Sequence, residues 1–386
     1  MQFASAISTA EDAGQALEEL TEKVNRELGD IALSLAIIFV SPHHESCFAE
    51  IGVRIRELCG VDHLIGCTAR GIIGASQEIE EGPAISIWVA ALPPESFTVF
   101  STEYQSTPDG VTFSGWPVGL DEMSADEHGI VLFADPFSFD PHPFLERLQE
   151  DVPGLGVVGG LASGGQTRGE NVLYLDDDVF HEGAVGVCFC GSLKVSSVVS
   201  QGCKPIGDCL VVTETDQNVI LKLGGKSALA RLQDVFSDLD SHDQEIFQKG
   251  PHLGRVVNEY QESFGRGDFL VRNIIGVDPK RRAIVIGDFV RPGQTIQFHA
   301  RDAESADEDL RALMQGHKAS SALLFACNGR GQHMFDEPNH DISVLQQALG
   351  TVPIAGFFAS GEIGPVGNKN FLHGFTATIL LFDRIP

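Results

Sequence analysis

Two short polar segments near the C-terminus contain the residue types best suited to holding a small charged ligand. The first reads Asn328-Gly329-Arg330-Gly331, and the second reads Gly356-Phe357-Phe358-Ala359-Ser360-Gly361-Glu362. An arginine offers a planar fork of donors that matches a carboxylate or phosphate. Glycines let backbone N–H groups approach a ligand closely. With Glu362 to contact a cationic group, the two segments could grip a zwitterion such as an amino acid.

The same residues also allow an internal explanation. If the strands before the two segments are neighbours, Arg330 and Glu362 lie at the same sheet edge and could pair with each other. Cys327 directly precedes Asn328. Its thiol could be activated by the arginine, which would suit a thiol-dependent enzyme, or it could be a buried structural cysteine. Spacing alone leaves these alternatives open.

The glycine segment at 356 belongs to a repeated pattern that must position it. The phrase Gly-x-x-Ala-[Arg/Ser]-Gly occurs three times, and each copy follows an apolar run that ends in Phe, with a helix-like segment between run and phrase. The runs end at Phe39, Phe133 and Phe325, and the phrases are Gly66–Gly71, Gly159–Gly164 and Gly356–Gly361. Such self-similarity predicts a reused strand–helix–strand–glycine-loop unit.

We expect each phrase to be a loop that begins where its strand ends. The strands would then span 63–66, 155–158 and 353–355. The interval between the second and third copies is about twice the first interval, so it could hide a diverged fourth unit. Strand-like runs beside the units favour an α/β fold of two domains, with mixed β-sheets flanked by helices and a break near residue 203.

Composition narrows the class of protein. The 386 residues include 26 Lys+Arg and 54 Asp+Glu, which gives a net charge of −28. Phosphate backbones and anionic lipid surfaces attract basic faces, so we expect no nucleic-acid partner and no binding to an anionic membrane surface. The longest apolar stretch, around Ile31–Val40, is too short to span a bilayer, so we expect no membrane insertion. The N-terminus lacks a signal-peptide pattern, and none of the eight cysteines forms a Cys-x-x-Cys. We expect an acidic cytoplasmic protein with reduced thiols and no required metal.

The C-terminal segments carry a family resemblance. The stretches Phe325–Gly331, Pro353–Pro365 and Leu372-His373-Gly374-Phe375 resemble a FIST protein. The resemblance implies a FIST N-type sensory domain over 1–203 and a FIST C-type ligand-binding domain over 204–386. The first phrase departs from the family pattern at Arg70, where a small residue is more usual.

The resemblance implies a cytoplasmic sensory and signal-transduction module that binds a small polar metabolite such as an amino acid. It implies a binding protein rather than an enzyme, with a separate signalling protein as its output. The ligand-binding residues would be Asn328, Gly329, Arg330, Gly331, Gly356, Phe357, Phe358, Ser360, Gly361 and Glu362. Some relatives look like haem-based nitric oxide sensors. Haem held by His43, His44, His340 or His373 is therefore an alternative, and a ligand-free scaffold is another.

Overall fold

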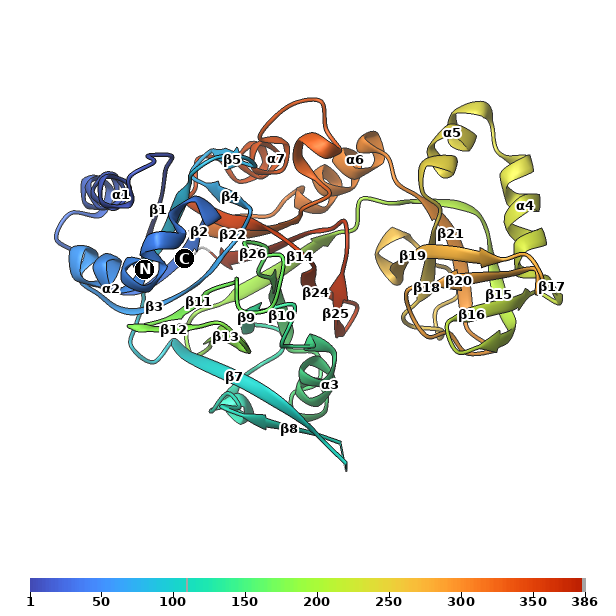
Figure 1. Ribbon diagram of the computed structural model, residues 1–386, viewed down its shortest axis with the longest axis horizontal. Helices are drawn as coiled ribbons and strands as arrows, with labels where there is room; N and C mark the ends of the chain where they lie inside the picture. The colour runs from blue at the N-terminus through green and yellow to red at the C-terminus, as the bar shows by residue number, and fades with distance from the viewer. Residues whose placement is uncertain (109, 384–386) are drawn as a thin grey trace. The chain divides into compact units, whose positions relative to one another are not determined.

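The computed structural model describes residues 1–108 and 110–383 (Figure 1). The chain forms two compact units: unit 1 comprises Met1–Val199 and Leu313–Pro386, and unit 2 comprises Ser200–Ala312. Seven α-helices and 26 strands in four sheets occur in the described residues, which confirms the α/β class. The expected break near 203 lies close to the start of unit 2. The predicted second domain of 204–386 differs from unit 2, because the chain returns to unit 1 at Leu313.

Unit 1 contains three strand–helix–strand segments whose two strands run parallel to each other. In each segment a single helix connects the pair, as parallel pairing requires. The segments are β2 (Leu33–Val40), α2 (Phe48–Cys59) and β3 (Val61–Thr68); β9 (Gly129–Ala134), α3 (Pro141–Asp151) and β10 (Gly156–Leu161); and β22 (Ala319–Cys327), α7 (His340–Leu349) and β23 (Ile354–Ala359).

Further strands extend each parallel pair into a six- or seven-stranded sheet. The orders are β1-β6-β2-β3-β11-β12, β25-β24-β10-β9-β13-β7-β8 and β14-β26-β22-β23-β4-β5. The other elements of unit 1 are β1 (Gln2–Ser8), α1 (Ala13–Leu28), η1 (Pro42–Cys47), β4 (Gly71–Gly74), β5 (Gln77–Ile79), β6 (Ile85–Ala91), β7 (Phe97–Thr107), β8 (Gly110–Ser114), η2 (Leu120–Glu122), β11 (Leu173–Leu175), β12 (Asp178–Phe180), β13 (Ala184–Phe189), β14 (Val195–Ser200), η4 (Gly331–His333), β24 (Glu362–Val366), β25 (Lys369–His373) and β26 (Ala377–Asp383).

The phenylalanines that end the three apolar runs meet in one core. The ring centroids lie 5.3 Å apart for Phe39 and Phe133, 5.6 Å for Phe133 and Phe325, and 6.3 Å for Phe39 and Phe325. All three side chains are fully buried. Because aromatic rings bury large areas and favour such edge contacts, this cluster fixes the three sheets against one another.

The first glycine of each phrase lies inside a strand and not in a loop, which corrects the expected strand ends. A Cβ at Gly66 would stand 2.2 Å from the Ile38 carbonyl oxygen of the parallel neighbour strand, and one at Gly356 would stand 1.6 Å from that of Leu324. Gly159 meets the Leu132 carbonyl oxygen in the same way, at 2.0 Å. These glycines therefore permit close strand packing.

The hairpin that follows each phrase joins the sheet of a different segment. Strand β4 pairs with β23, β11 pairs with β3, and β24 pairs with β10. Backbone hydrogen bonds close the junctions: Leu161 N donates to Gly361 O at 2.8 Å, and Ser163 N donates to Thr68 O at 3.3 Å. The three phrases thus interlock around the centre of unit 1, and each sheet is completed by residues from elsewhere in the chain.

Local sequence explains how the helices start and stop. The Asp12 side chain accepts a hydrogen bond from Gln15 N at the start of α1, a typical N-cap. Gly60 ends α2 in the left-handed conformation, with φ of 61°, which lets the chain turn directly into β3. The helices then cover the outer faces of strands that are buried on both sides, such as β2.

Unit 2 is an antiparallel sheet that closes on itself. Its strand order is β15-β21-β18-β19-β20-β16-β17, and β15 also pairs with β16. The interval between the second and third phrases therefore holds a small barrel instead of a fourth parallel segment. The elements are β15 (Lys204–Asp216), β16 (Val219–Leu223), β17 (Lys226–Ser227), α4 (Ala228–Asp238), α5 (Ser241–Lys249), β18 (His252–Val256), η3 (Arg266–Asp268), β19 (Phe269–Asp278), β20 (Ala283–Ile286), β21 (Thr295–Ala300) and α6 (Ala303–Met314).

All eight cysteines are free. Over the described ranges, no helix has the length and apolar character needed to span a bilayer.

Candidate functional site

A cleft of about 570 Å³ in unit 1 opens beside the carboxyl ends of β22 and β23. One side comes from the loop after β22, and the other comes from the β4–β5 hairpin, which pairing between β4 and β23 brings there. Figure 1 shows α7 beside this hairpin. The lining residues are Arg70, Gly71, Glu78, Ile79, Glu80, Glu81, Asn328, Gln332, His333 and Phe358.

A buried ion pair stands behind the cleft. Arg330, which is 0% exposed, donates from Nε and Nη2 to the two carboxylate oxygens of Asp341, at 2.7 Å each. Burial opposes both charges, yet the mutual attraction raises the pKa of Arg330 and holds that of Asp341 well below its usual range. The Phe335 ring lies 5.3 Å from the guanidinium carbon. This bidentate pair fixes the loop after β22 to the start of α7.

Glu78 on β5 connects the hairpin to the same helix. It is 5% exposed, and its Oε1 accepts a hydrogen bond from Ile342 N at 2.7 Å, in the first turn of α7. Its Oε2 is buried and has no hydrogen-bond partner. Burial, followed by the nearby carboxylates of Asp341 and Glu80, raises the pKa of Glu78 to about 8. Burial thus favours the protonated form of this carboxyl, which can donate a hydrogen bond.

Glu80 binds the backbone of the loop after β22, next to Gly331. Gly331 has φ of 60°, and a Cβ there would lie 2.5 Å from the Glu80 carboxylate. The absence of a side chain lets that carboxylate accept a hydrogen bond from Gln332 N at 2.9 Å. Gly331 is therefore needed both for its left-handed backbone and for this close approach.

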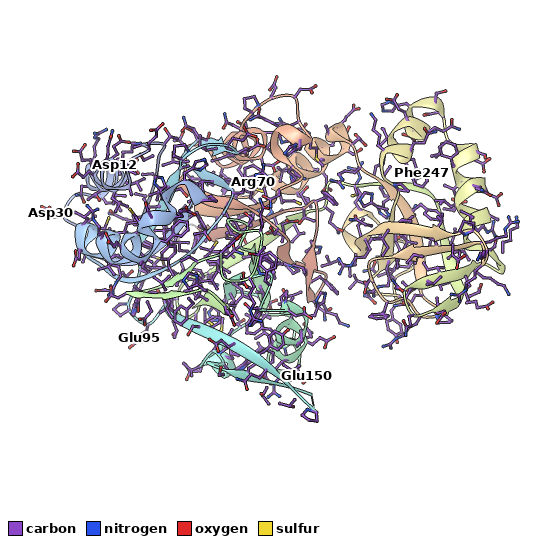
Figure 2. All side chains as sticks on the ribbon, in the orientation of Figure 1. Asp12, Asp30, Arg70, Glu95, Glu150 and Phe247 are labelled. Atoms are coloured by element: carbon purple, nitrogen blue, oxygen red, sulfur yellow. The ribbon has the colours of Figure 1, made fainter. Side chains whose placement is uncertain are left out.

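Arg70 supplies the exposed positive charge of the cleft. It directly precedes β4 and is labelled in Figure 2. Its backbone N donates to Ser163 Oγ at 3.0 Å, which anchors the main chain while the side chain stays exposed. Among the described residues, no carboxylate pairs with its guanidinium. A partnerless arginine at the edge of an acidic cleft is suited to an anionic ligand group.

The geometry favours an internal ion pair for Arg330, with Asp341 as its partner in place of Glu362. Glu362 is itself fully buried, and its Oε2 accepts from Thr376 N at 3.0 Å and from Thr376 Oγ1 at 2.8 Å. Burial raises the pKa of Glu362 to about 7. Neither charged side chain lines the cleft, so direct ligand contact by either one gains no support from this arrangement.

Cys327 lacks the features of an activated nucleophile. Burial and the neighbouring Glu362 carboxylate raise the pKa of its thiol to about 12. A reactive cysteine needs an environment that lowers this pKa, because the thiolate is the nucleophile. The buried structural alternative describes Cys327 better.

Some of the other predicted ligand-binding residues line the cleft, and others are buried in the core. Asn328 and Phe358 line the cleft, and Asn328 Nδ2 donates to the exposed Ser360 Oγ at 3.4 Å. Gly356 and Phe357 are buried in β23. Gly361 accepts the backbone bond from Leu161, and Gly329 N donates to Cys327 Sγ at 3.4 Å.

Two of the four histidines considered as haem ligands, His340 and His373, contact polar groups of the protein. His340 contacts Asp341 Oδ1 at 2.9 Å, and His373 Nε2 lies 2.9 Å from Gly364 O. His44 is buried, whereas His43 is exposed. Across the described part of the chain, no cluster of three or more His, Cys, Asp or Glu side chains is arranged for a metal ion.

Sequence reasoning missed most of the cleft. Arg70 differed from the serines of the other two phrases, and that difference was the one available signal. Glu78, Glu80 and Glu81 follow the first phrase, but they reach Asn328 only because β4 pairs with β23, and no local pattern predicts this pairing.

The fold defines an α/β protein, and comparison with known proteins identifies its family. A FIST N domain profile matches residues 34–226, and a FIST C domain profile matches residues 228–365. The chain belongs to the FIST family. FIST domains are generally regarded as sensory and signal-transduction domains.

Two mycobacterial relatives are similar over nearly their whole length. An uncharacterized protein of Mycobacterium tuberculosis is 40% identical over 388 residues, covering 99% of this chain and 100% of that protein. An uncharacterized protein of Mycobacterium bovis is 38% identical over 389 residues, covering 99% of each. A structure titled "Cyanuric acid hydrolase: evolutionary innovation by structural concatenation" aligns with a TM-score of 0.28 and 7% identity, covering 99% of this chain and 100% of that one.

Proposed function

We propose that this protein is a sensory module that binds a free amino acid in the cleft between the β4–β5 hairpin and the loop after β22. The observation that carries the proposal is Arg70. Its exposed guanidinium has no carboxylate partner within the described residues, yet it lines one cavity with three glutamates. That pairing of opposite charges suits a zwitterion.

The roles of the polar groups follow from their chemistry. Arg70 takes the ligand carboxylate as a bidentate pair. Glu80 and Glu81 face the ligand ammonium group, and Asn328 offers an amide that can donate and accept. The cavity of about 570 Å³ has room for any common amino acid, together with some water.

Arg330 acts from behind the cleft in this proposal. Its ion pair with Asp341 holds the loop after β22 in place, so Asn328 and Gln332 are presented at fixed positions. A ligand that bridges this loop and the β4–β5 hairpin stabilises their contact. A separate output protein would respond to that change, and the three similar segments of unit 1 would derive from an internal repeat.

Thermal shift with a panel of the common L-amino acids tests the proposal. A ligand that binds the folded state raises the melting temperature. Arg70→Ala should abolish the shift, and Arg70→Lys should weaken it, because lysine keeps the charge but not the fork. Arg26→Ala on α1 removes an exposed arginine elsewhere and should leave the shift unchanged.

Two results would overturn the assignment. If no amino acid stabilises the wild-type protein, the ligand-free scaffold becomes the better description. If Arg70→Ala binds as tightly as the wild type, the ligand lies elsewhere.

A further inference from the structure

The charges around the cleft do not balance. Three carboxyl groups line it, those of Glu78, Glu80 and Glu81, against the basic side chains of Arg70 and His333. The second arginine of the region, Arg330, is already neutralised by Asp341 through two hydrogen bonds of 2.7 Å. A zwitterion brings no net charge, so it would leave this excess of carboxylates in place. A ligand of net positive charge would complement it.

Glu78 is the carboxyl whose environment most needs a cation. Glu78 lines the cleft, its Oε1 accepts from Ile342 N, and its Oε2 is buried without a hydrogen-bond partner. The charged groups that act on Glu78 are Asp341 on α7, Glu80 after β5 and Arg330. Two of these three are carboxylates. Arg330 binds Asp341 through Nε and Nη2, and its Nη1 is buried without a hydrogen-bond partner. Burial and these carboxylates favour the protonated form of Glu78.

We propose that the ligand is a cationic amino acid, whose α-carboxylate binds Arg70 and whose basic side-chain group replaces the proton of Glu78. This inference rests on the proposed amino-acid site. When the ligand binds, the O–H bond of Glu78 breaks and the proton passes to solvent, while an N–H of the ligand donates to the resulting carboxylate. Total charge is conserved, because one proton leaves for each cationic group that enters.

Binding of a cationic ligand is coupled to loss of the Glu78 proton, so the affinity should change with pH in a measurable direction. The raised pKa of Glu78, about 8, means that this proton must be removed at neutral pH before the cation can pair. Affinity for a cationic amino acid should therefore rise by up to about tenfold per pH unit between pH 6 and pH 7.5. A neutral amino acid does not require Glu78 to lose its proton, so its affinity should stay nearly constant over the same pH range.

Titration calorimetry of the full chain with L-lysine and L-alanine tests the inference. At pH 7, L-lysine should bind at least tenfold more tightly than L-alanine. The heat measured in buffers of different ionisation enthalpy should show release of a proton with L-lysine and none with L-alanine. Putrescine, which lacks the carboxylate, should bind more weakly than L-lysine.

Glu78→Gln identifies the residue responsible. Glutamine keeps an acceptor for Ile342 N but cannot release a proton. L-lysine affinity should fall to that of L-alanine, proton release should vanish, and L-alanine binding should not change. Glu18→Gln, at an exposed position on α1, is the matched control.

The outcomes separate the two proposals. If L-alanine binds as tightly as L-lysine, or if L-lysine releases no proton, the charge inference is wrong and the amino-acid site stands. If putrescine binds as tightly as L-lysine, the Arg70–carboxylate contact is wrong. If no amino acid binds the wild type at any pH, both proposals fall. The buffer comparison uses the wild-type protein, so it decides the matter even if Glu78→Gln does not fold.

Discussion

Two arginines near the cleft behave in opposite ways, and the contrast separates architecture from binding. Arg330 is 0% exposed and is held by both oxygens of Asp341. Arg70 is exposed, and no carboxylate of the described residues pairs with it. Arg330 has the glycine-flanked sequence that suggests a ligand grip, whereas Arg70 lies in a phrase that looks structural. Burial and partners, not flanking glycines, decide which arginine is available to a ligand.

Removing Arg330 should give the largest effect. Arg330→Ala leaves the Asp341 carboxylate buried without its partner, which typically costs about 3–5 kcal/mol. Urea unfolding followed by tryptophan fluorescence measures this, because Trp88 and Trp116 both belong to unit 1. The double variant Arg330→Met, Asp341→Leu removes both charges and should lose less stability. A loss below about 1 kcal/mol for the single variant would mean that the ion pair is not structural.

A methyl group at Gly356 should come next. Its Cβ would stand 1.6 Å from the Leu324 carbonyl oxygen, so Gly356→Ala must push β22 and β23 apart. Overpacking of this kind costs about 1–3 kcal/mol or more. Ser360→Ala, at an exposed position in the same phrase, should change stability by less than about 0.5 kcal/mol. Equal effects in the two variants would contradict the strand-packing role of the first glycine.

Glu78 should make stability depend on pH. Its pKa is about 8 in the folded protein and near its ordinary 4.5 in the unfolded chain, so the folded state binds more protons between those values. The stabilising contribution of this carboxyl is fully present below pH 4.5 and is lost as the pH rises through 8. The slope is at most about 1.4 kcal/mol per pH unit.

Comparing Glu78→Gln with the wild type from pH 5 to pH 8.5 isolates this contribution. The variant should become more stable relative to the wild type as the pH rises, as measured by urea midpoints. A difference that stays constant with pH would show that Glu78 is ionised throughout.

Arg70 should give the smallest effect on stability. Arg70→Ala removes an exposed side chain, so the unfolding free energy should change by less than about 0.5 kcal/mol. Ligand binding, in contrast, should weaken at least tenfold. If Arg70→Ala destabilised the protein as much as Arg330→Ala, Arg70 would also have a structural role, which would contradict the contrast between the two arginines.

The sequence predicted the framework better than the site. Runs ending at Phe39, Phe133 and Phe325 marked the first strand of each parallel pair, because strands buried on both faces are continuously apolar. A glycine after an apolar run is typical of a turn, so the pattern predicts strand ends at 66, 158 and 355, whereas the strands continue to Thr68, Leu161 and Ala359. The clash that each glycine avoids involves a second strand, so it cannot be inferred from one segment.

The barrel of unit 2 shows a similar limit. The interval between the second and third glycine phrases is about twice the first interval. This length fits either a diverged fourth repeat or an inserted unit of a different fold. Only pairing of β15 with both β21 and β16 distinguishes a closed barrel from another parallel segment.

By itself, the sequence determined the α/β class, the three similar segments and the family, because apolar periodicity and glycine phrases are local properties of the chain. Only the tertiary structure decided which charges meet. Arg330 binds Asp341. Arg70 lines the same cleft as Glu80 and Asn328 because β4 pairs with β23. Burial and long-range strand pairing set the availability of each charged group, and both depend on residues far away in the sequence.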